Sequence, residues 1–249
     1  MKINADILQI LSTLETDGPN ARIVGQLNRK FYLAVDKILQ AAGGKWNRKA
    51  KAHVFAGDAA EILDPIITCG EVTTSRELGF FVTPSPVIQI LMDLADIKAD
   101  DVVLEPSAGT GALVDAIIAT GASVTMVEYD MNRRQVLRDK YPHVPLVQVP
   151  DFLDTIPTFE FTKVVMNPPF TRVGKGDHLD HVQHAFRFLK PGGRLVTVLP
   201  SSIIFRQDKR YKAFRAWYEC YNGVVQDLPS QSFHMSGTDV NTVVLSMVA

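Results

Sequence analysis

Cysteines and long apolar runs are both scarce in this sequence. Its 249 residues include only two cysteines, Cys69 and Cys220, and their separation fits no metal-ligand motif. This excludes a disulfide-rich secreted scaffold and a zinc ribbon. No apolar run approaches the ~18 residues of a membrane span, and the amphipathic N-terminal segment carries acids, unlike a secretory or transit peptide. We predict a reduced, cytoplasmic protein with no bound metal and no membrane contact.

A strong net charge is also missing. The formal charge is −1, so the whole chain gives no sign of a nucleic-acid partner and any basic surface must be local. The hydrophobic content of 46% and charged fraction of 21% are ordinary for a globular protein. The length allows one large α/β domain with a small appendage.

Short apolar runs alternate with helical patterns from residue 101 onward. The predicted strands are 102–104, 123–127, 144–149, 163–166 and 194–199, and the predicted helices are 111–120, 131–141 and 179–189. This alternation predicts a parallel, doubly wound α/β sheet. Residues 224–228 and 242–247 are two further strands with no room for a crossover helix between them, so we expect an antiparallel hairpin at one edge of the sheet.

The first 75 residues lack this alternation. A helix at the N-terminus, a second one over 28–42 and a short run over 45–55 indicate a small α+β unit. We place the boundary near 73–77, which divides the chain into a unit of residues 1–75 and a domain of residues 76–249.

The segment VVLEPSAGTGAL, residues 102–113, reads as a strand, a tight loop and the start of a helix. Gly109 and Gly111 permit positive φ angles and a close backbone approach to a ligand, and the helix N-terminus can bind polar groups of a nucleotide-like molecule. A dinucleotide-binding loop would need a third glycine where Val114 stands. The carboxyl group of Glu105 suits a ligand with an ammonium or sulfonium centre, such as S-adenosylmethionine. A purely structural turn is the alternative.

Two acids follow further along the chain. Glu128 closes the apolar run of 124–127, where an acid commonly accepts hydrogen bonds from ribose hydroxyls. Beside it, Tyr129 could pack against an adenine ring. In the segment VPDFL, Asp151 could accept from the adenine amino group and Phe152 could cover the face of the ring. Each signal is weak alone, since an acid after a strand is often a solvated loop residue.

The segment VVMNPPF, residues 164–170, is a buried strand that stops at two prolines. The side-chain carbonyl of Asn167 and the backbone carbonyl of Pro168 both accept hydrogen bonds, and the fixed φ of Pro168 and Pro169 holds them in place. Phe170 offers a face for stacking. Such a corner could grip an aromatic amine and aim its nitrogen lone pair at an electrophile. The alternative is a strand-ending turn.

Five motifs occur in order along the chain: FFVTP (80–84), EPSAGTGAL (105–113), VEYD (127–130), DF (151–152) and NPPF (167–170). Together they resemble the class I S-adenosylmethionine-dependent amino-methyltransferases. The similarity is greatest to the N6-adenine DNA methyltransferases whose cofactor motif precedes the catalytic motif. The resemblance covers about residues 78–249, and it implies a Rossmann-like fold with a seven-stranded, mostly parallel sheet.

The resemblance also implies roles for individual residues. Phe81 and Thr83 would lie at the methionine end of the cofactor, with Glu105 and the loop from Ala108 to Gly111 beneath it. Catalysis would fall to the corner: Asn167 and Pro168 would hold the target amine beside Pro169, and Phe170 would stack on a flipped base, because N6 of adenine is inaccessible inside a duplex.

Basic residues concentrate in the N-terminal unit and near the C-terminus. Eight bases and one acid, Asp36, lie between Ala21 and His53. We interpret two groups as candidate nucleic-acid contacts. The groups are Lys45, Trp46, Arg48, Lys49 and Lys51 in the N-terminal unit, and Arg172, Lys175, Arg206 and Arg210 after the NPPF motif. A solvated surface or a protein contact is the alternative.

Three histidines, His178, His181 and His184, are spaced by three residues. On a helix this spacing spreads the rings apart, and no cysteine or acid completes a ligand set. We therefore predict a polar helix face near the substrate and no metal.

Sequence recognition is where the chain departs from the family pattern. Only about 80 residues follow the NPPF motif, and the last strands of the fold use them. Specificity must then come from the N-terminal unit, from short loops, or from a partner subunit or second copy; weak sequence specificity is the alternative. The leading hypothesis is a DNA adenine-N6 methyltransferase. An RNA base or a protein glutamine amide as substrate, and a non-catalytic nucleic-acid-binding module, are the alternatives.

Overall fold

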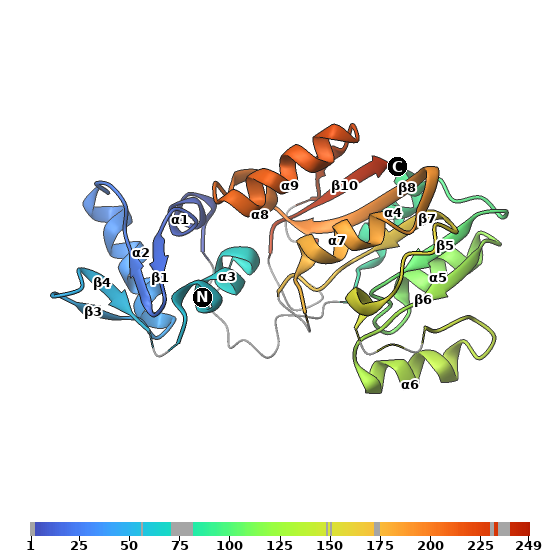
Figure 1. Ribbon diagram of the computed structural model, residues 1–249, viewed down its shortest axis with the longest axis horizontal. Coiled ribbons are helices and arrows are strands. Elements are labelled where there is room, and N and C mark those ends of the chain that lie inside the picture. Colours follow the sequence, from blue (N-terminus) through green and yellow to red (C-terminus); the bar gives the residue numbers. More distant parts are fainter. Residues whose placement is uncertain are drawn as a thin grey trace.

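The computed structural model describes residues 3–55, 57–70, 82–147, 149, 151–171, 175–229, 232–233 and 240–249. Two sheets organise the chain, a small one in the N-terminal unit and a large one in the remainder (Figure 1). The boundary predicted at 73–77 lies outside the described residues. None of the helices that the structure describes has both the length and the apolar character for a membrane crossing.

The large sheet has six strands in the described part of the chain. They are β5 (Val102–Glu105), β6 (Ser123–Met126), β7 (Phe161–Met166), β8 (Leu189–Pro200), β9 (Val224–Asp227) and β10 (Thr242–Val248). Their order is β6-β5-β7-β8-β10-β9. The first four are parallel, whereas β10 runs antiparallel to both β8 and β9. This confirms the predicted α/β class and the antiparallel edge hairpin.

The predicted strand over 144–149 is mostly absent. Only Leu146 forms a β-bridge, with Met126. Pro145 still accepts from the Met126 N–H at 2.8 Å, but it has no N–H of its own to extend a ladder. Within the described residues, the seventh strand is therefore reduced to this one bridge.

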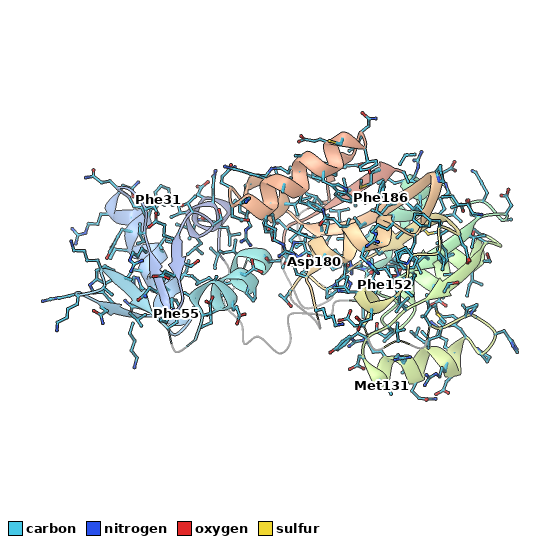
Figure 2. All side chains as sticks on the ribbon, viewed as in Figure 1. Phe31, Phe55, Met131, Phe152, Asp180 and Phe186 are labelled. Atoms are coloured by element: carbon cyan, nitrogen blue, oxygen red, sulfur yellow. The ribbon has the colours of Figure 1, made fainter. Side chains whose placement is uncertain are left out.

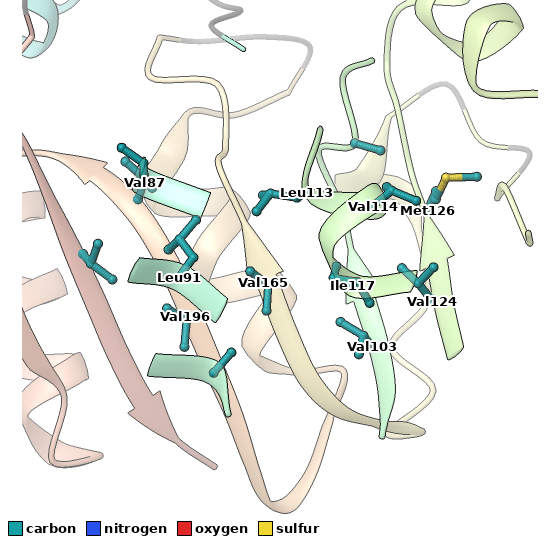
Figure 3. Close-up of a cluster of buried hydrophobic side chains, with 14 of the residues drawn as sticks. Val87, Leu91, Val103, Leu113, Val114, Ile117, Val124, Met126, Val165 and Val196 are labelled. Carbon is teal, nitrogen blue, oxygen red and sulfur yellow. The ribbon is translucent and has the colours of Figure 1, made fainter. Parts of the chain in front are cut away.

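Two layers of helices cover the large sheet. One layer contains α4 (Ser85–Ala95), α5 (Ala112–Ala119) and α6 (Met131–Lys140). Figure 3 shows Val87, Leu91 and Ile117 of this layer packed with strand residues such as Val103 and Val165, all nearly fully buried. The opposite layer contains α7 (His178–Phe186), α8 (Ser202–Phe205) and α9 (Lys209–Cys220). Helix α7 ends three residues before the predicted end, because the chain enters β8 at Leu189.

The N-terminal unit is an α+β structure with a core of its own. Its elements are α1 (Ala5–Leu11), β1 (Glu15–Asp17), β2 (Asn20–Arg22), α2 (Arg29–Ala41), β3 (Lys45–Asn47), β4 (Ala52–Val54) and α3 (Ala59–Cys69). The strands form an antiparallel sheet in the order β1-β2-β4-β3. Phe31 and Phe55, labelled in Figure 2, pack with the helices. Neither the β1–β2 hairpin nor α3 was predicted from the sequence.

The two units are in contact beside α8. Phe205 of α8 packs against the core of the N-terminal unit. The next residue, Arg206, forms an ion pair with Asp64 of α3 at 2.5 Å. The N-terminal unit is therefore joined to the α9 layer of the larger unit by both an apolar and a charged contact.

Candidate active site

The carboxyl ends of three parallel strands meet at one edge of the large sheet. Strand β5 ends at Glu105, β6 is followed by Glu128, and β7 is followed by Asn167. This edge is where open α/β sheets bind ligands. A cavity of about 470 Å³ opens there. Its lining includes these sequence-predicted residues: Thr83, Glu105, Ala108, Gly109, Glu128, Tyr129, Phe152, Asn167, Pro168, Pro169 and Phe170.

Glu105 is fully buried at the floor of the cavity. Its Oε1 accepts the N–H of Ser107 at 3.0 Å, while Oε2 accepts no hydrogen bond from the described residues. Burial raises the pKa of Glu105 to about 8, and the neighbouring Glu128 carboxylate adds to the shift. A buried carboxyl group with an unsatisfied oxygen fits a ligand that brings a positive charge or an N–H donor.

The two loop glycines differ in what they do. Both have positive φ, +57° at Gly109 and +92° at Gly111. Gly109 lines the cavity, as predicted. Gly111 does not, and a Cβ atom there would lie 2.4 Å from the hydroxyl of Tyr141. This glycine makes room for the Tyr141 ring and is the N-cap of α5, and the close approach of a ligand at Gly111 stays a prediction.

Glu128 is held by several donors at once. Its Oε2 accepts the Gly109 N–H at 2.8 Å, and its Oε1 accepts the Asp130 N–H at 2.8 Å. Arg133, one turn into α6, adds an ion pair at 2.8 Å. Glu128 is only 4% exposed, yet it lines the cavity. Its carboxylate is therefore a rigid acceptor beyond the end of β6.

Asp151 is placed differently from its neighbour Phe152. Its carboxylate accepts the N–H groups of Leu153 and Lys175, both at 2.9 Å, and it is absent from the cavity lining. Asp151 thus caps a short 3₁₀ helix and fixes the chain at Lys175, and its contact with an adenine amino group stays a prediction. Phe152 lines the cavity and packs against His181 and His184. Tyr129, 49% exposed, stands at the rim.

The Asn-Pro-Pro-Phe corner lines the same cavity as Glu105 and Glu128. The side-chain N–H of Asn167 donates to the hydroxyl of Thr83 at 3.1 Å. This bond orients the amide, because the nitrogen arm is directed to Thr83 and the oxygen arm away from it. Thr83 therefore serves the corner as well as the predicted cofactor end, a link that sequence spacing could not reveal.

Phe170 lines the cavity but offers no open face. It is 1% exposed and lies edge-on to Phe233, with ring centroids 6.1 Å apart. Stacking on a base remains a prediction, and it requires Phe170 or its neighbours to rearrange.

The three histidines of α7 have separate environments. The ring of His178 bonds Phe170 and Tyr211, His181 lines the cavity, and the ring of His184 lies 3.1 Å from the hydroxyl of Thr155. Burial lowers the pKa of all three, to about 4 for His181. No group of three metal-ligating side chains occurs among the described residues.

The candidate nucleic-acid contacts separate into exposed and engaged groups. Five of them surround the β3–β4 hairpin and are exposed: Lys45, Trp46, Arg48, Lys49 and Lys51. Lys175 is exposed but pairs with Asp154. Arg210 pairs with Asp177 and Asp180, and Arg206, 12% exposed at its side chain, pairs with Asp64 and Asp208. Both Arg206 and Arg210 belong to ion-pair networks of the fold, and their contact with nucleic acid stays a prediction. Phe81 and Arg172 lie outside the described residues.

Several residues of the site were not predicted from the sequence. Ser107, Asp130 and His181 line the cavity, and Arg133 both lines it and holds Glu128. The five-residue spacing from Glu128 to Arg133 was the one available signal for that ion pair. His181 was predicted only as part of a polar helix face near the substrate, with no role of its own in the site.

The family of the chain follows from its sequence as well as its site. The model of the methyltransferase small domain family matches residues 87–215, which include all three strand ends of the cavity. The chain belongs to this family. The predicted class I methyltransferase fold is confirmed, and class I methyltransferases use S-adenosylmethionine as the methyl donor.

Relatives of this methyltransferase come from two groups. The type II restriction enzyme and methyltransferase RM.BcgI of Heyndrickxia coagulans is 26% identical over 78% of this chain and 37% of its own length. A ribosomal RNA small subunit methyltransferase A of Thermotoga neapolitana is 34% identical, over 41% of each chain. This methyltransferase thus spans less than half the length of these two relatives.

A solved structure extends the similarity of fold to the N-terminal unit. The modification subunit of a putative type I restriction enzyme from Vibrio vulnificus YJ016 aligns with a TM-score of 0.59 and 14% identity. The alignment covers 90% of this methyltransferase and 50% of the subunit. At this identity the likeness establishes the fold alone.

Proposed function

We propose that this methyltransferase transfers a methyl group to the exocyclic N6 amine of adenine in DNA. One observation carries the proposal: the acceptor groups of Asn167 and Pro168 share a single cavity with the carboxylates of Glu105 and Glu128. The first pair suits an aromatic amine, and the second suits a cationic nucleoside cofactor. A donor and an acceptor bound in one cavity can react without leaving it.

The residues present fit S-adenosylmethionine. The unsatisfied Oε2 of Glu105 offers an acceptor to a cationic or N–H group, and Glu128 offers an acceptor to ribose hydroxyls. Gly109 lines the cavity and has no side chain, so it leaves space for a ligand beside its backbone. The bound cofactor supplies an electrophilic methyl group on a sulfonium sulfur.

The corner supplies orientation in place of a strong base. Asn167 Oδ1 and the carbonyl of Pro168 accept the two amine hydrogens, which turns the nitrogen lone pair toward the methyl group. A cofactor held by Glu105 and Glu128 would supply the methyl group and leave as a neutral thioether, and the proton displaced from the amine would pass along the Asn167 or Pro168 hydrogen bond to solvent. Thr83 keeps the Asn167 amide in the productive orientation throughout.

The exposed β3–β4 hairpin supports a nucleic-acid substrate. Its four cations and the 47% exposed Trp46 combine charge for phosphates with a ring for stacking. The relative RM.BcgI is described as a restriction enzyme and methyltransferase, which favours DNA. An RNA base is the second candidate, because the relatives also include ribosomal RNA methyltransferases. Sequence recognition would use the N-terminal unit or a partner subunit.

Transfer of a labelled methyl group to separate pools of DNA, RNA and protein tests the proposal. We expect label in DNA at adenine N6, identified by nucleoside mass spectrometry, and none with Asn167→Ala. If the label appears only in RNA or only in protein, DNA is not the substrate, and the labelled pool identifies the substrate class. Cofactor binding without transfer to any pool would favour a non-catalytic nucleic-acid-binding module.

A further inference from the structure

A chain of polar contacts runs from the N-terminal unit to the catalytic corner. Asp64 of α3 pairs with Arg206 at 2.5 Å, and the same guanidinium nitrogen of Arg206 lies 3.3 Å from the hydroxyl of Tyr211. That hydroxyl lies 3.1 Å from Nε2 of His178. The Nδ1 of His178 lies 2.8 Å from the backbone carbonyl of Phe170. We call these five residues the relay.

The direction of every hydrogen bond in the relay is determined by its two ends. The carbonyl of Phe170 can only accept, so Nδ1 of His178 carries the hydrogen. Burial lowers the pKa of His178, so the ring is neutral and Nε2 has a lone pair. Tyr211, whose pKa is raised by burial, keeps its proton and donates it to Nε2. Its oxygen then accepts from Arg206, which cannot be deprotonated.

The interior of the relay is shielded from water. His178 is 0% exposed and Tyr211 is 1% exposed, and the Arg206 guanidinium lies 4.1 Å from the Tyr211 ring centroid. Buried polar groups destabilise the folded state unless all of their hydrogen bonds are made. Apolar side chains could fill the same space without this requirement. A fully connected network fixes one arrangement of its members, so the relay specifies the geometry of whatever it ends on.

The relay ends on the one part of the corner that proline does not constrain. Pro168 and Pro169 have fixed φ angles, but Phe170 is free of that restriction. The bond from His178 fixes the peptide plane that follows Phe170. Thr83 holds the Asn167 amide at the other end of the motif. The corner is thus fixed by its prolines in the middle and by long-range contacts at both ends.

We propose that the relay makes the N-terminal unit a part of the catalytic support, with His178 and Tyr211 as positioning residues for the Asn167–Phe170 corner. The proposal rests on the function proposed above, since it assigns the relay to methyl transfer at that corner. The hairpin that would contact nucleic acid and the residue that starts the relay, Asp64, belong to the same unit. A shift of that unit would therefore reach the corner through four hydrogen bonds.

Removal of the Tyr211 hydroxyl and of the Asp64 charge, each in the chain of residues 1–249, tests the relay. Tyr211→Phe keeps the ring and loses two relay bonds, and Asp64→Asn loses the charge at its start. We expect each to lower kcat about five- to tenfold, the effect of losing a buried hydrogen bond, with KM and cofactor affinity within about twofold. The combined variant should fall by less than the product of the two losses, because both act through one path. Tyr218→Phe, on the same helix, and Glu61→Gln, on α3, are matched controls outside the relay.

Hydrogen exchange at the corner provides a readout that needs no turnover. In Tyr211→Phe and Asp64→Asn, the backbone amides of Asn167, Phe170 and Thr171 should exchange about threefold or more faster than in the controls, as expected for a locally loosened segment. If wild-type protein transfers no methyl group to any pool, the proposed function fails, and this exchange measurement still decides whether the relay holds the corner. Exchange and kcat that match the two controls would overturn the relay.

Discussion

The two halves of the cavity are supported in different ways. On the cofactor side, Glu105 and Glu128 each accept a hydrogen bond from the backbone N–H two residues further along. On the corner side, the contacts are remote in sequence: Asn167 bonds Thr83 across 84 positions, and Arg206 reaches Asp64 across 142. One half is built by local turns, and the other depends on the assembled fold.

This difference separates what a substitution should change. A change on the cofactor side should alter binding of the cofactor. Each carboxylate there is held by its own local turn, so substituting one residue leaves the other turns intact. A change in the support of the corner should alter kcat, because ground-state binding uses other groups. Each prediction below tests one side of this division.

Asn167→Ala should have the largest effect. It removes an acceptor aimed at the reacting amine, so we expect kcat to fall on the order of 10²–10³-fold, as for other preorganised hydrogen-bonding groups. Cofactor affinity by calorimetry should stay near the wild-type value. Asn241→Ala, at an exposed asparagine, is the control. A loss of cofactor binding equal to the loss of turnover would show that the two sides are not separable.

Glu128→Ala should show the opposite pattern. The lost acceptor is charged, and such hydrogen bonds contribute about 1.5–3 kcal/mol, so the cofactor Kd should rise about 10- to 100-fold. At saturating cofactor, kcat should change little. Glu160→Ala, at an exposed glutamate, controls for the removal of a carboxylate. If Glu128→Ala binds a cofactor analogue without ribose hydroxyls as tightly as wild type does, the ribose contact is supported. If the variant loses as much affinity for the analogue as for the cofactor, the ribose contact is contradicted.

Glu105→Gln should change how stability depends on pH in the absence of ligand. The pKa of Glu105 is raised from 4.5 to about 8, so the folded protein binds this proton more tightly than the unfolded chain. The carboxyl group therefore destabilises the fold increasingly as pH rises from 4.5 to about 8, and the penalty is absent below 4.5. The variant should match wild type in Tm near pH 4.5 and exceed it by several degrees above pH 8. Glu219→Gln, exposed on α9, should follow wild type at every pH.

Local support also explains which parts of the site could be predicted from the sequence. Glu105, Gly109 and Glu128 lie on short strand-to-helix turns whose residue types are visible in the chain, and all three line the cavity. Asn167 was found for the same reason, because a strand that runs into two prolines can only end there. The same alternation of strands and helices predicted the large sheet.

Sequence spacing could not reveal contacts that depend on a distant residue. Gly111 accommodates Tyr141, which lies 30 positions away. Arg206 forms its ion pair with Asp64, which lies 142 positions away in the sequence. Helix α3 contains Pro65 in its interior, which speaks against a helix, yet its N-cap Asp58 and its buried apolar face hold it together. None of these partners can be paired from spacing alone.

Lys49→Ala should have the smallest effect, and it tests whether the N-terminal unit does more than support the corner. Lys49 is exposed near the β3–β4 hairpin, far in sequence from the cavity. A lysine that contacts one phosphate releases about one counterion, so its removal should reduce the slope of log K against log salt by about 1.

Binding of this variant to a fluorescent DNA duplex should weaken only a few-fold at low salt, while kcat at saturating DNA should stay unchanged. Lys190→Ala, an exposed lysine at the start of β8, should leave both the affinity and the slope as they are. If the two variants behave alike, the hairpin makes no phosphate contact, and the N-terminal unit would serve the corner through Asp64 alone. If Lys49→Ala instead lowers kcat, the hairpin and the relay are coupled, and the division between binding and support would not hold for this unit.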